Sequence, residues 1–382
     1  MPPATTSRDP MRCRIHPRVL PLRRPFRTSG WTLAQRDILL FSIHDARSQL
    51  SGWGEAAPLP VFGTEDHAAC LHALEAAAVY FDDADNFPAA GEAEREAVIS
   101  RLEGAIPDLA AAPAARFAVE CALLDLDARI RGISMAAALG GRYRDSIPVN
   151  AVIGGGDAVE AGADAEAAWK AGFTCVKIKV GGGSLEEDIA RVRAVRLAVP
   201  DDVLLRLDAN GAWDFGAAEQ ALREFALYDI EYIEQPVAAD EVDELAALTG
   251  LGIMFVAADE SAQNLEQAHM LLARGAVNLF VIKPMAVGSL CACRAFALEA
   301  AERGCDVVFT SLIDSAIGRN AVAQLCASLP HSPRHHGLAT GSLFLEDTGH
   351  DRIVQGHFLL SDVAGLGISP MGIPGEQETE LA

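Results

Sequence analysis

Five short apolar segments in the second half of this 382-residue chain end in charged side chains that could do chemistry together. The segments are 176–180, 205–208, 230–234, 255–260 and 280–283. The charged positions at their ends follow one another at intervals of about 24 to 29 residues, which is the length of one strand plus one helix. Because the carboxyl ends of the strands of a β/α barrel meet at one mouth, we expect these side chains to gather there.

Three carboxylates come from three consecutive segments of this set, namely Asp208, Glu234 and Asp259. Without a counterion they would repel one another and raise one another's pKa values, so a divalent cation is their natural partner. Oxygen ligands with no histidine or cysteine favour Mg²⁺, or alternatively Mn²⁺, over zinc. The sequence therefore predicts a magnesium site at the mouth.

Lysines flank the three carboxylates on both sides. Lys177 and Lys179 lie two residues apart, so a strand would direct both to the same face, and Lys283 ends a later segment. A substrate carboxylate bound at the cation would lie between ammonium groups. A lysine whose pKa is lowered by such neighbours can remove a proton next to that carboxylate, while the metal stabilises the resulting enediolate. The predicted partner is accordingly a small-molecule carboxylate.

Each of these residues also has a simpler explanation when it is taken alone. An acidic residue at a strand end is more often a helix N-cap or half of a surface ion pair, and Asp208-Ala-Asn-Gly could be an Asx turn. A single buried lysine is more often structural. The shared spacing of five segments favours a site. His331, His335 and His336 are expected to lie in a loop outside it.

The elements that would carry these residues alternate as strand then helix from about residue 147 to about residue 340. Candidate strands are 149–153, 175–180, 203–208, 230–234, 254–258, 279–283 and 307–311, with a weaker eighth at 336–340. Strands separated by helices pair in parallel. The pattern predicts an α/β fold, a (β/α)7–8 barrel of the TIM type, with a doubly wound open sheet as the alternative.

The first part of the chain differs from the rest in composition and periodicity. It is rich in strand formers over 11–60 and in alanine with helical spacing over 66–140. A chain of this length also exceeds the roughly 250–300 residues at which single cores stop growing. We predict an α+β capping domain over 1–145, the catalytic barrel over 146–340 and a C-terminal segment over 341–382.

Composition excludes several classes of function. A net charge of −22 argues against nucleic-acid binding, and 50% hydrophobic residues argue against disorder. The first 30 residues hold seven arginines but no apolar stretch, so neither a signal peptide nor a membrane anchor is expected. The eight scattered cysteines are typical of buried thiols in a reducing compartment, which predicts a cytoplasmic protein. Whether the chain is a monomer or a homo-oligomer stays open.

Taken together, the motifs resemble those of the enolase superfamily, in its mandelate racemase and muconate-lactonizing-enzyme subgroup. The motifs are Lys177-Ile-Lys179, Asp208-Ala-Asn-Gly, Glu234-Gln-Pro, Asp259-Glu-Ser and Lys283-Pro. The resemblance covers nearly the whole chain and implies that the C-terminal segment folds back onto the cap. It also implies metal ligation by the three carboxylates, a general base at Lys179, a counterpart on the opposite face at Lys283 and a supporting role for Lys177.

The same resemblance assigns residues around the centre. Asn210 and Glu260 would orient the ligands and Lys283. Two cap loops, at 24–29 and 58–64, would close the pocket. The implied substrate contacts are Arg27, Phe62 and Thr64 from the cap loops, and Gly288, Ser311 and Asp314 from the barrel.

Within the subgroup, the segments 53–65, 310–318 and 336–341 are similar to those of o-succinylbenzoate synthases. That similarity implies a hydro-lyase of menaquinone biosynthesis, in which Lys179 takes the proton and Lys283 stays a cation. The alternatives are a dipeptide epimerase or N-succinylamino-acid racemase, in which both lysines are acid and base, and then a muconate-type cycloisomerase. Dipeptide epimerases carry an Asp-x-Asp that binds the substrate ammonium; the stretch 342–348 lacks it, although Glu346 or Asp347 could substitute.

A barrel that binds a ligand without catalysis is the hypothesis from another class. Loss of a metal ligand or of a lysine would favour it, and all of them are present in the sequence.

Overall fold

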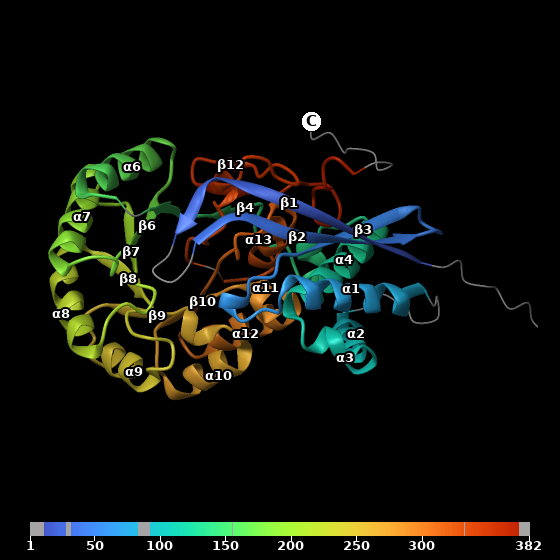
Figure 1. The fold of residues 1–382 in the computed structure, drawn as a ribbon, viewed down its shortest axis with the longest axis horizontal. Helices are drawn as coiled ribbons and strands as arrows, with labels where there is room; N and C mark the ends of the chain where they lie inside the picture. The colour runs from blue at the N-terminus through green and yellow to red at the C-terminus, as the bar shows by residue number, and fades with distance from the viewer. Residues whose placement is uncertain (1–10, 28–31, 83–91, 155, 332, 374–382) are drawn as a thin grey trace, which may run out of the picture.

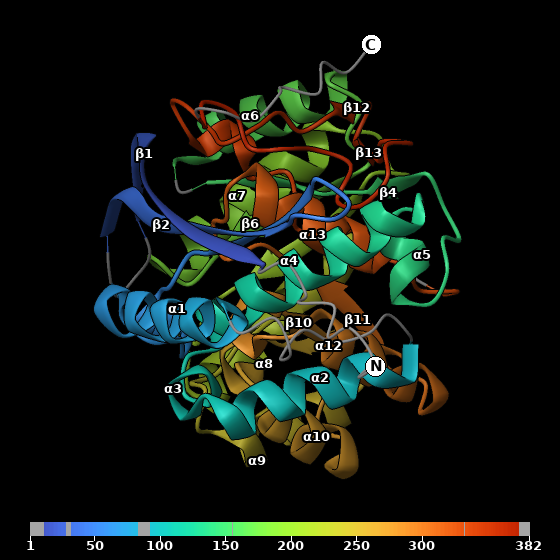
Figure 2. The same cartoon turned by 90° about the vertical axis from the view of Figure 1, so that its right-hand side faces the viewer.

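The computed structural model describes residues 11–27, 32–82, 92–154, 156–331 and 333–373. They form a cap built on a small antiparallel sheet and a parallel barrel, which lie side by side in Figure 1. Figure 2 shows the cap helices in front of the barrel. None of the helices in these ranges is long and apolar enough to cross a membrane. All eight cysteines fall in these ranges and are free thiols; five are buried as predicted, whereas Cys13, Cys291 and Cys305 are only half-buried.

The cap sheet has the order β1 (Arg12–Arg27), β2 (Thr32–Asp45) and β3 (Leu50–Ala56). Its helices are α1 (His67–Asp82), α2 (Glu92–Ala105), α3 (Pro107–Ala110), α4 (Pro113–Arg131) and α5 (Met135–Leu139). Gly52 and Gly54 let α4 lie directly against β3, because a Cβ at either position would collide with the backbone of Ala122 or Ala118. The predicted α+β cap is confirmed.

The barrel strands follow one another in sequence order, without the reversal of strand order that defines a doubly wound sheet. They are β5 (Ala151–Ile153), β6 (Cys175–Lys179), β7 (Leu204–Asp208), β8 (Ile230–Glu234), β9 (Phe255–Ala258), β10 (Leu279–Ile282) and β11 (Asp306–Phe309). The helices are α6 (Ala158–Lys170), α7 (Leu185–Ala198), α8 (Phe215–Phe225), α9 (Val242–Gly250), α10 (Leu265–Arg274), α11 (Pro284–Val287), α12 (Leu290–Glu302) and α13 (Ala316–Ala327). In Figure 1, α6 to α10 curve around the outside of these strands.

The predicted eighth strand is reduced to a two-residue bridge that closes the ring. The backbone of His336 donates to Pro148 at 2.8 Å and accepts from Asn150 at 3.1 Å, while Gly337 donates to Phe309 at 2.9 Å. His336 therefore belongs to the barrel wall, not to a loop outside it, and it is only 1% exposed. The barrel prediction is confirmed.

The C-terminal segment returns to the cap. It pairs β12 (Ile353–Val354) and β13 (His357–Leu359) with β4 (Ser146–Pro148), and then runs along α4. There the buried carboxylate of Asp125 accepts hydrogen bonds from the backbone of Leu366 at 2.6 Å and of Trp53 at 2.9 Å. One side chain thus ties β3, α4 and the C-terminal segment together. The exact divisions at residues 145 and 340 remain a prediction.

Buried charged groups of the cap bind the mouth side of the barrel. Glu55 accepts hydrogen bonds from the backbone of Ser315 at 2.7 Å and Gly318 at 2.8 Å, at the start of α13. A carboxylate at this position satisfies the free N–H groups of a helix start and complements its dipole. Arg36 donates to Pro58 O at 2.9 Å and Ile313 O at 3.2 Å, which joins a cap loop to a barrel loop. These contacts fix the cap over the strand ends.

His336 should make the fold sensitive to acid. Burial, with the charges of Arg206 and Arg144, lowers its pKa to about 3, whereas an unfolded histidine titrates near 6.5. Below about pH 6.5 the unfolded chain takes up the proton first, so stability falls as the pH decreases. In His336→Asn, the Oδ1 of the new side chain can still accept from Phe309 N. We expect the free energy of unfolding of this variant to fall by about 2 kcal/mol less than that of wild type when the pH is lowered from about 7 to about 5.

Urea unfolding at the two pH values would measure this difference. His72→Asn, at a histidine that is 70% exposed, is the matched control and should behave like wild type. An equal loss of stability in wild type and His336→Asn would show that His336 does not cause the acid sensitivity.

Candidate active site

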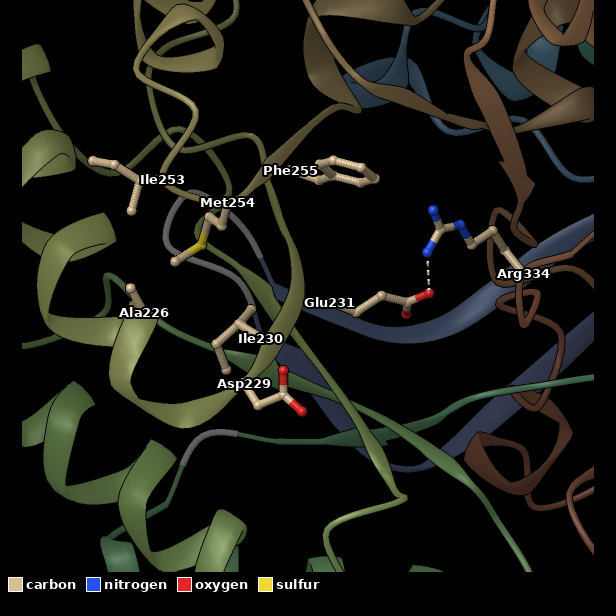
Figure 3. A pocket seen from close by; sticks show the side chains of 8 residues that line it. All are labelled: Ala226, Asp229, Ile230, Glu231, Ile253, Met254, Phe255 and Arg334. Carbon is tan, nitrogen blue, oxygen red and sulfur yellow. Dashed lines mark hydrogen bonds and ion pairs between the residues drawn. The ribbon is translucent and has the colours of Figure 1, made fainter.

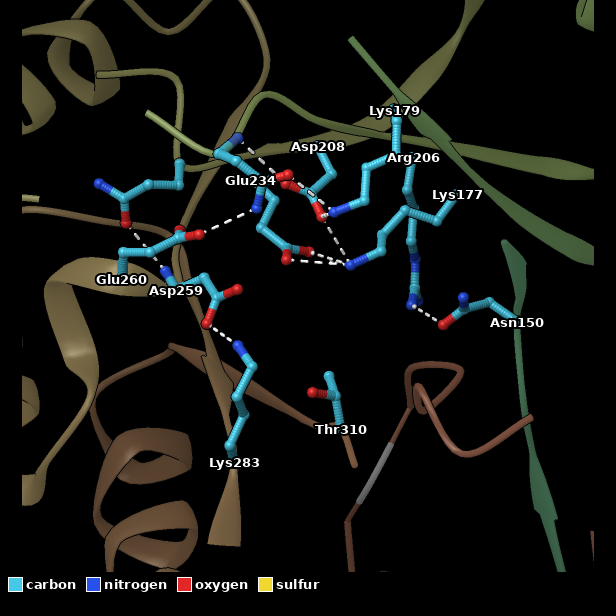
Figure 4. A network of polar contacts seen from close by, with 12 residues as sticks. Asn150, Lys177, Lys179, Arg206, Asp208, Glu234, Asp259, Glu260, Lys283 and Thr310 are labelled. Carbon is cyan, nitrogen blue, oxygen red and sulfur yellow. Dashed lines mark hydrogen bonds and ion pairs between the residues drawn. The ribbon is translucent and has the colours of Figure 1, made fainter. Parts of the chain in front are cut away.

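The charged residues at the strand ends all lie at one mouth of the barrel (Figure 4). Asp208 and Glu234 are the last residues of β7 and β8 and pair in register, and Lys179 pairs with Asp208 on the other side. Asp259 follows β9 directly, as Lys283 follows β10. The strand-by-strand spacing in the sequence therefore brought these side chains to one place, because parallel strands in register present equivalent positions on the same face.

Each of the three carboxylates is paired with a lysine. Lys177 Nζ lies 2.9 Å from Asp208 Oδ2 and 3.0 Å from Glu234 Oε1. Lys179 Nζ lies 2.6 Å from Asp208 Oδ2, and Lys283 pairs with Asp259. The side chains of the three acids are at most 7% exposed, whereas the Lys179 side chain is 28% exposed, against 14% for Lys177. Of these two lysines of β6, Lys179 is the better placed to meet a substrate.

Burial and charge set the ionisation of this group. Burial and the neighbouring Asp208 raise the pKa of Glu234 to about 8. Burial opposes ionisation of Asp208, yet the ammonium groups of Lys177 and Lys179 hold its pKa well below the usual range. Burial likewise opposes the charge on Lys177, but Asp208 and Glu234 raise its pKa well above the ordinary value. Lys177 is therefore a fixed cation, unsuited to act as a base near neutral pH.

The three carboxylates have the chemistry of a site for a hard cation. Their oxygens suit Mg²⁺ or Mn²⁺. Burial and repulsion by Asp208 disfavour the ionised form of Glu234, and the positive charge of a divalent cation would offset both effects. Within the described ranges, no three side chains of His, Cys, Asp or Glu stand close enough together to form a ready metal site. Lys177 lies between Asp208 and Glu234 instead, so joint ligation would require side-chain rotations at the mouth.

Asn210 and Glu260 lie beside this group, as the sequence predicted. Asn210 Oδ1 accepts from Lys179 Nζ at 2.8 Å, and its Nδ2 donates to Glu260 Oε1 at 2.9 Å. Burial and the adjacent Asp259 raise the pKa of Glu260 to about 7. The side chain of Asn210 thus holds Lys179, and its backbone N–H also donates to Asp208 Oδ1 at 3.2 Å. That Asn210 and Glu260 orient the ligands and Lys283 stays a prediction.

Phe62 lies at the mouth among the predicted substrate contacts. It ends the short turn η1 (Pro60–Phe62) of the cap, and Lys283 Nζ is 4.5 Å from the centre of its ring. This distance is typical of a cation–π contact. Ser311 Oγ lies 2.7 Å from Thr340 Oγ1, in the loop that follows β11. Arg27 ends β1, and its side chain lies outside the described residues.

Three other residues predicted to contact the substrate form hydrogen bonds within the protein itself. Thr64 Oγ1 accepts from Leu59 N at 2.6 Å and shapes the cap loop. Gly288 O accepts from Arg116 of the cap at 3.1 Å. Asp314 is 1% exposed and accepts from Leu312 N at 3.0 Å, and burial and Glu55 raise its pKa to about 7. These contacts give no support to a substrate role for the three residues, which stays a prediction.

Sequence reasoning missed a second charged layer inside the barrel. Arg206 is fully buried below the mouth, where it pairs with Glu231 and lies 4.8 Å from the ring of Tyr232. An arginine within an apolar strand was the signal that could have revealed it. Glu231 also pairs with Arg334, at a hollow of about 330 Å³ (Figure 3). That hollow lies at the amino ends of β8 and β9, opposite the mouth, and is separate from the candidate site.

A β/α barrel with ionisable groups gathered at the carboxyl ends of its strands has the arrangement of a barrel enzyme. Residues 160–372 match the family model of enolase C-terminal domain-like proteins. The L-Ala-D/L-Glu epimerase of Bacillus subtilis (strain 168) is 32% identical over 316 residues, which cover 81% of this chain and 82% of that protein. The o-succinylbenzoate synthase of Thermobifida fusca (strain YX) is 36% identical over 219 residues, 57% of this chain and 67% of that protein.

A solved structure gives the same result. The dipeptide epimerase of Enterococcus faecalis V583, complexed with Mg and the dipeptide L-Leu-L-Tyr, superposes with a TM-score of 0.84 at 26% identity, over 94% of this chain and 99% of that chain. The chain therefore belongs to the enolase superfamily, in the mandelate racemase and muconate lactonizing enzyme subgroup. Its relatives include both lyases and isomerases.

Proposed function

We propose that this chain is a Mg²⁺-dependent enzyme that removes a proton next to the carboxylate of a small-molecule substrate, with Mn²⁺ as a possible substitute. One observation carries the proposal. Lys179 and Lys283 belong to the ends of β6 and β10, and the strands between these two present Asp208, Glu234 and Asp259. A carboxylate at this mouth would therefore lie between two ammonium groups.

Asp208, Glu234 and Asp259 are the residues proposed to hold the metal. When bound, Mg²⁺ would supply positive charge opposite the negative charge that develops on the substrate carboxylate as the proton leaves. The solved relative that contains Mg and a dipeptide supports this cofactor. Lys177, whose ammonium contacts both Asp208 and Glu234 in this structure, would add positive charge beside the metal.

Lys179 is the proposed general base. Asn210 holds its ammonium from one side, and the side chain is partly open to solvent. Lys283, between Asp259 and the ring of Phe62, is held on the other side of the mouth.

Among the specific reactions, we propose the dehydration catalysed by o-succinylbenzoate synthases, a step of menaquinone biosynthesis. Lys179 would take the proton next to the carboxylate and return it to the departing hydroxyl. A carbon–carbon double bond forms, the carbon–oxygen bond breaks, and water leaves. Lys283 would remain a cation throughout. The identity of 36% to the synthase of Thermobifida fusca supports this assignment.

One of the two residues that could have bound a dipeptide's ammonium group, Asp347, is already engaged. Asp347 accepts from Arg319 at 2.6 Å and from the backbone of Ala316 at 2.8 Å, at the start of α13. Glu346 is exposed. A carboxylate that is already paired with a guanidinium is poorly available to an ammonium ligand, and this favours the synthase over a dipeptide epimerase.

Epimerisation or racemisation is the second candidate. The flanking positions of Lys179 and Lys283 suit proton removal on one face and return on the other, and the relative that matches 81% of this chain is an epimerase. A muconate-type cycloisomerase stays a third possibility.

Turnover by the purified full-length protein separates these reactions. With Mg²⁺ present, we expect dehydration of the cyclohexadiene precursor of o-succinylbenzoate, and no α-deuteration of L-Ala-L-Glu, other dipeptides or N-succinyl amino acids in D₂O. Deuteration with inversion, and little dehydration, would make the chain a racemase or epimerase. Lys179→Ala protein prepared in parallel excludes activity from contaminants. If no substrate exchanges or reacts, the proposed proton abstraction is wrong.

A further inference from the structure

Gln235 lies directly after the end of β8, beside the candidate site, although the proposed reaction assigns no role to an amide there. It follows Glu234 directly and is fully buried. Its φ is 41°, in the left-handed region that residues other than glycine rarely adopt. Such strain persists where the surroundings determine the conformation, and it clusters at functional sites.

The amide of Gln235 uses all of its hydrogen-bonding capacity on the turn that carries Asp259. Oε1 accepts from Asp259 N and from Ser261 N, both at 3.0 Å. Nε2 donates to Ser261 Oγ at 2.7 Å and to Val237 O at 2.9 Å. Two accepted and two donated bonds are the full complement of a glutamine amide.

The backbone of Gln235 joins the neighbouring strand ends. Its N–H donates to Ala257 O of β9 at 2.9 Å, and its carbonyl accepts from Gly211 N, in the loop after β7, at 2.7 Å. This one residue therefore connects the ends of β7, β8 and β9, which carry Asp208, Glu234 and Asp259.

Asp259 depends on such a connection because it lies outside the regular strand. Its backbone, with φ −120° and ψ −78°, leaves the β conformation and starts the short turn η4 (Glu260–Ala262). The β-ladder between β8 and β9 ends before Asp259, at the pairing of Glu234 with Ala257. Gln235 Oε1 supplies the hydrogen bonds that the first N–H groups of this turn would otherwise lack.

We propose that Gln235 is a positioning residue, which holds the backbone that carries Asp259 beside the end of β8, so that the carboxylates of Asp259 and Glu234 can reach one divalent cation. This inference rests on the proposed function, because it takes Asp208, Glu234 and Asp259 as metal ligands. Groups that orient metal ligands change metal affinity when they are removed, whereas a buried amide that only stabilises a loop changes stability alone. The two roles therefore predict different measurements.

Direct binding of Mn²⁺ to the full-length protein, measured by isothermal titration and by the EPR signal of free Mn²⁺, tests the inference without any substrate. Gln235→Met keeps the side-chain length but deletes the four hydrogen bonds. We expect its Kd for Mn²⁺ to rise about 10- to 100-fold. Ser261→Ala removes only one partner of the amide and should weaken binding in the same direction by a smaller factor. Gln220→Met, on the exposed face of α8, is the matched control and should bind as wild type.

The outcomes separate the inference from the proposed function. If wild type does not bind Mn²⁺, the metal site itself is wrong and the inference fails with it. If wild type binds and Gln235→Met binds equally well, with only its thermal midpoint lowered, Gln235 is structural and the inference alone is overturned. Should Gln235→Met fail to fold, as judged by circular dichroism, Ser261→Ala decides: an unchanged Kd overturns the inference.

Discussion

Lys179→Ala is expected to reduce kcat by about 100- to 10,000-fold, which is the usual contribution of a positioned general base. The side chain lies at the open mouth, where its ammonium donates to Asp208 and Asn210, so its removal should leave the fold intact. Steady-state kinetics with saturating Mg²⁺ and circular dichroism measure the two effects. Lys170→Ala, at an exposed lysine of α6, is the control for loss of a lysine elsewhere. Near-full activity of Lys179→Ala would show that another group is the base.

Lys283 distinguishes the two leading reactions. Lys283→Ala should also lose at least about 100-fold in turnover, whichever role the lysine has. Lys283→Arg keeps the positive charge but cannot exchange a proton near neutral pH. If Lys283 only holds charge, as the proposed dehydration requires, Lys283→Arg should stay within about tenfold of wild type. If the enzyme is a racemase or epimerase, Lys283→Arg should be as inactive as Lys283→Ala.

Removal of divalent cations by EDTA is expected to abolish turnover, and added Mg²⁺ or Mn²⁺ should restore it. Without the cation, the charge that develops on the substrate carboxylate would face the buried Asp208, Glu234 and Asp259 with only lysine ammonium groups to offset it. Added Mg²⁺ should also raise the thermal midpoint, since a ligand at about 100 times its Kd stabilises the folded state by about 2.7 kcal/mol.

EDTA saturated beforehand with Ca²⁺ controls for effects of the chelator that are unrelated to metal removal. Undiminished activity after dialysis against EDTA would count against the three-carboxylate site. Loss of activity that Mg²⁺ and Mn²⁺ both fail to restore would show that another metal, or irreversible unfolding, is responsible.

The sequence alone determined the architecture and the charged residues that gather at the mouth. Strands and helices have local periodicities, and parallel pairing follows from the helices between strands, so the barrel could be predicted. Once strands run in order around a barrel, one residue per strand end at regular spacing must meet at one mouth. This is why the spacing of Asp208, Glu234, Asp259, Lys179 and Lys283 was enough to predict that they lie together. The eighth strand was the weakest of the predicted strands, and only two of its residues pair in the structure.

Only the tertiary structure decided how these side chains face one another. Whether Lys177 contacts Asp208 or a substrate depends on rotamers and on charges supplied by other strands. The left-handed backbone of Gln235 and its hydrogen bonds to the turn after β9 join segments about 25 residues apart, and no local pattern encodes that contact. The pairing of Asp347 with Arg319 of α13 is likewise a contact that no local pattern encodes. Spacing along the chain specifies which residues meet, whereas non-local packing and hydrogen bonding specify their partners, and the partners decide the chemistry.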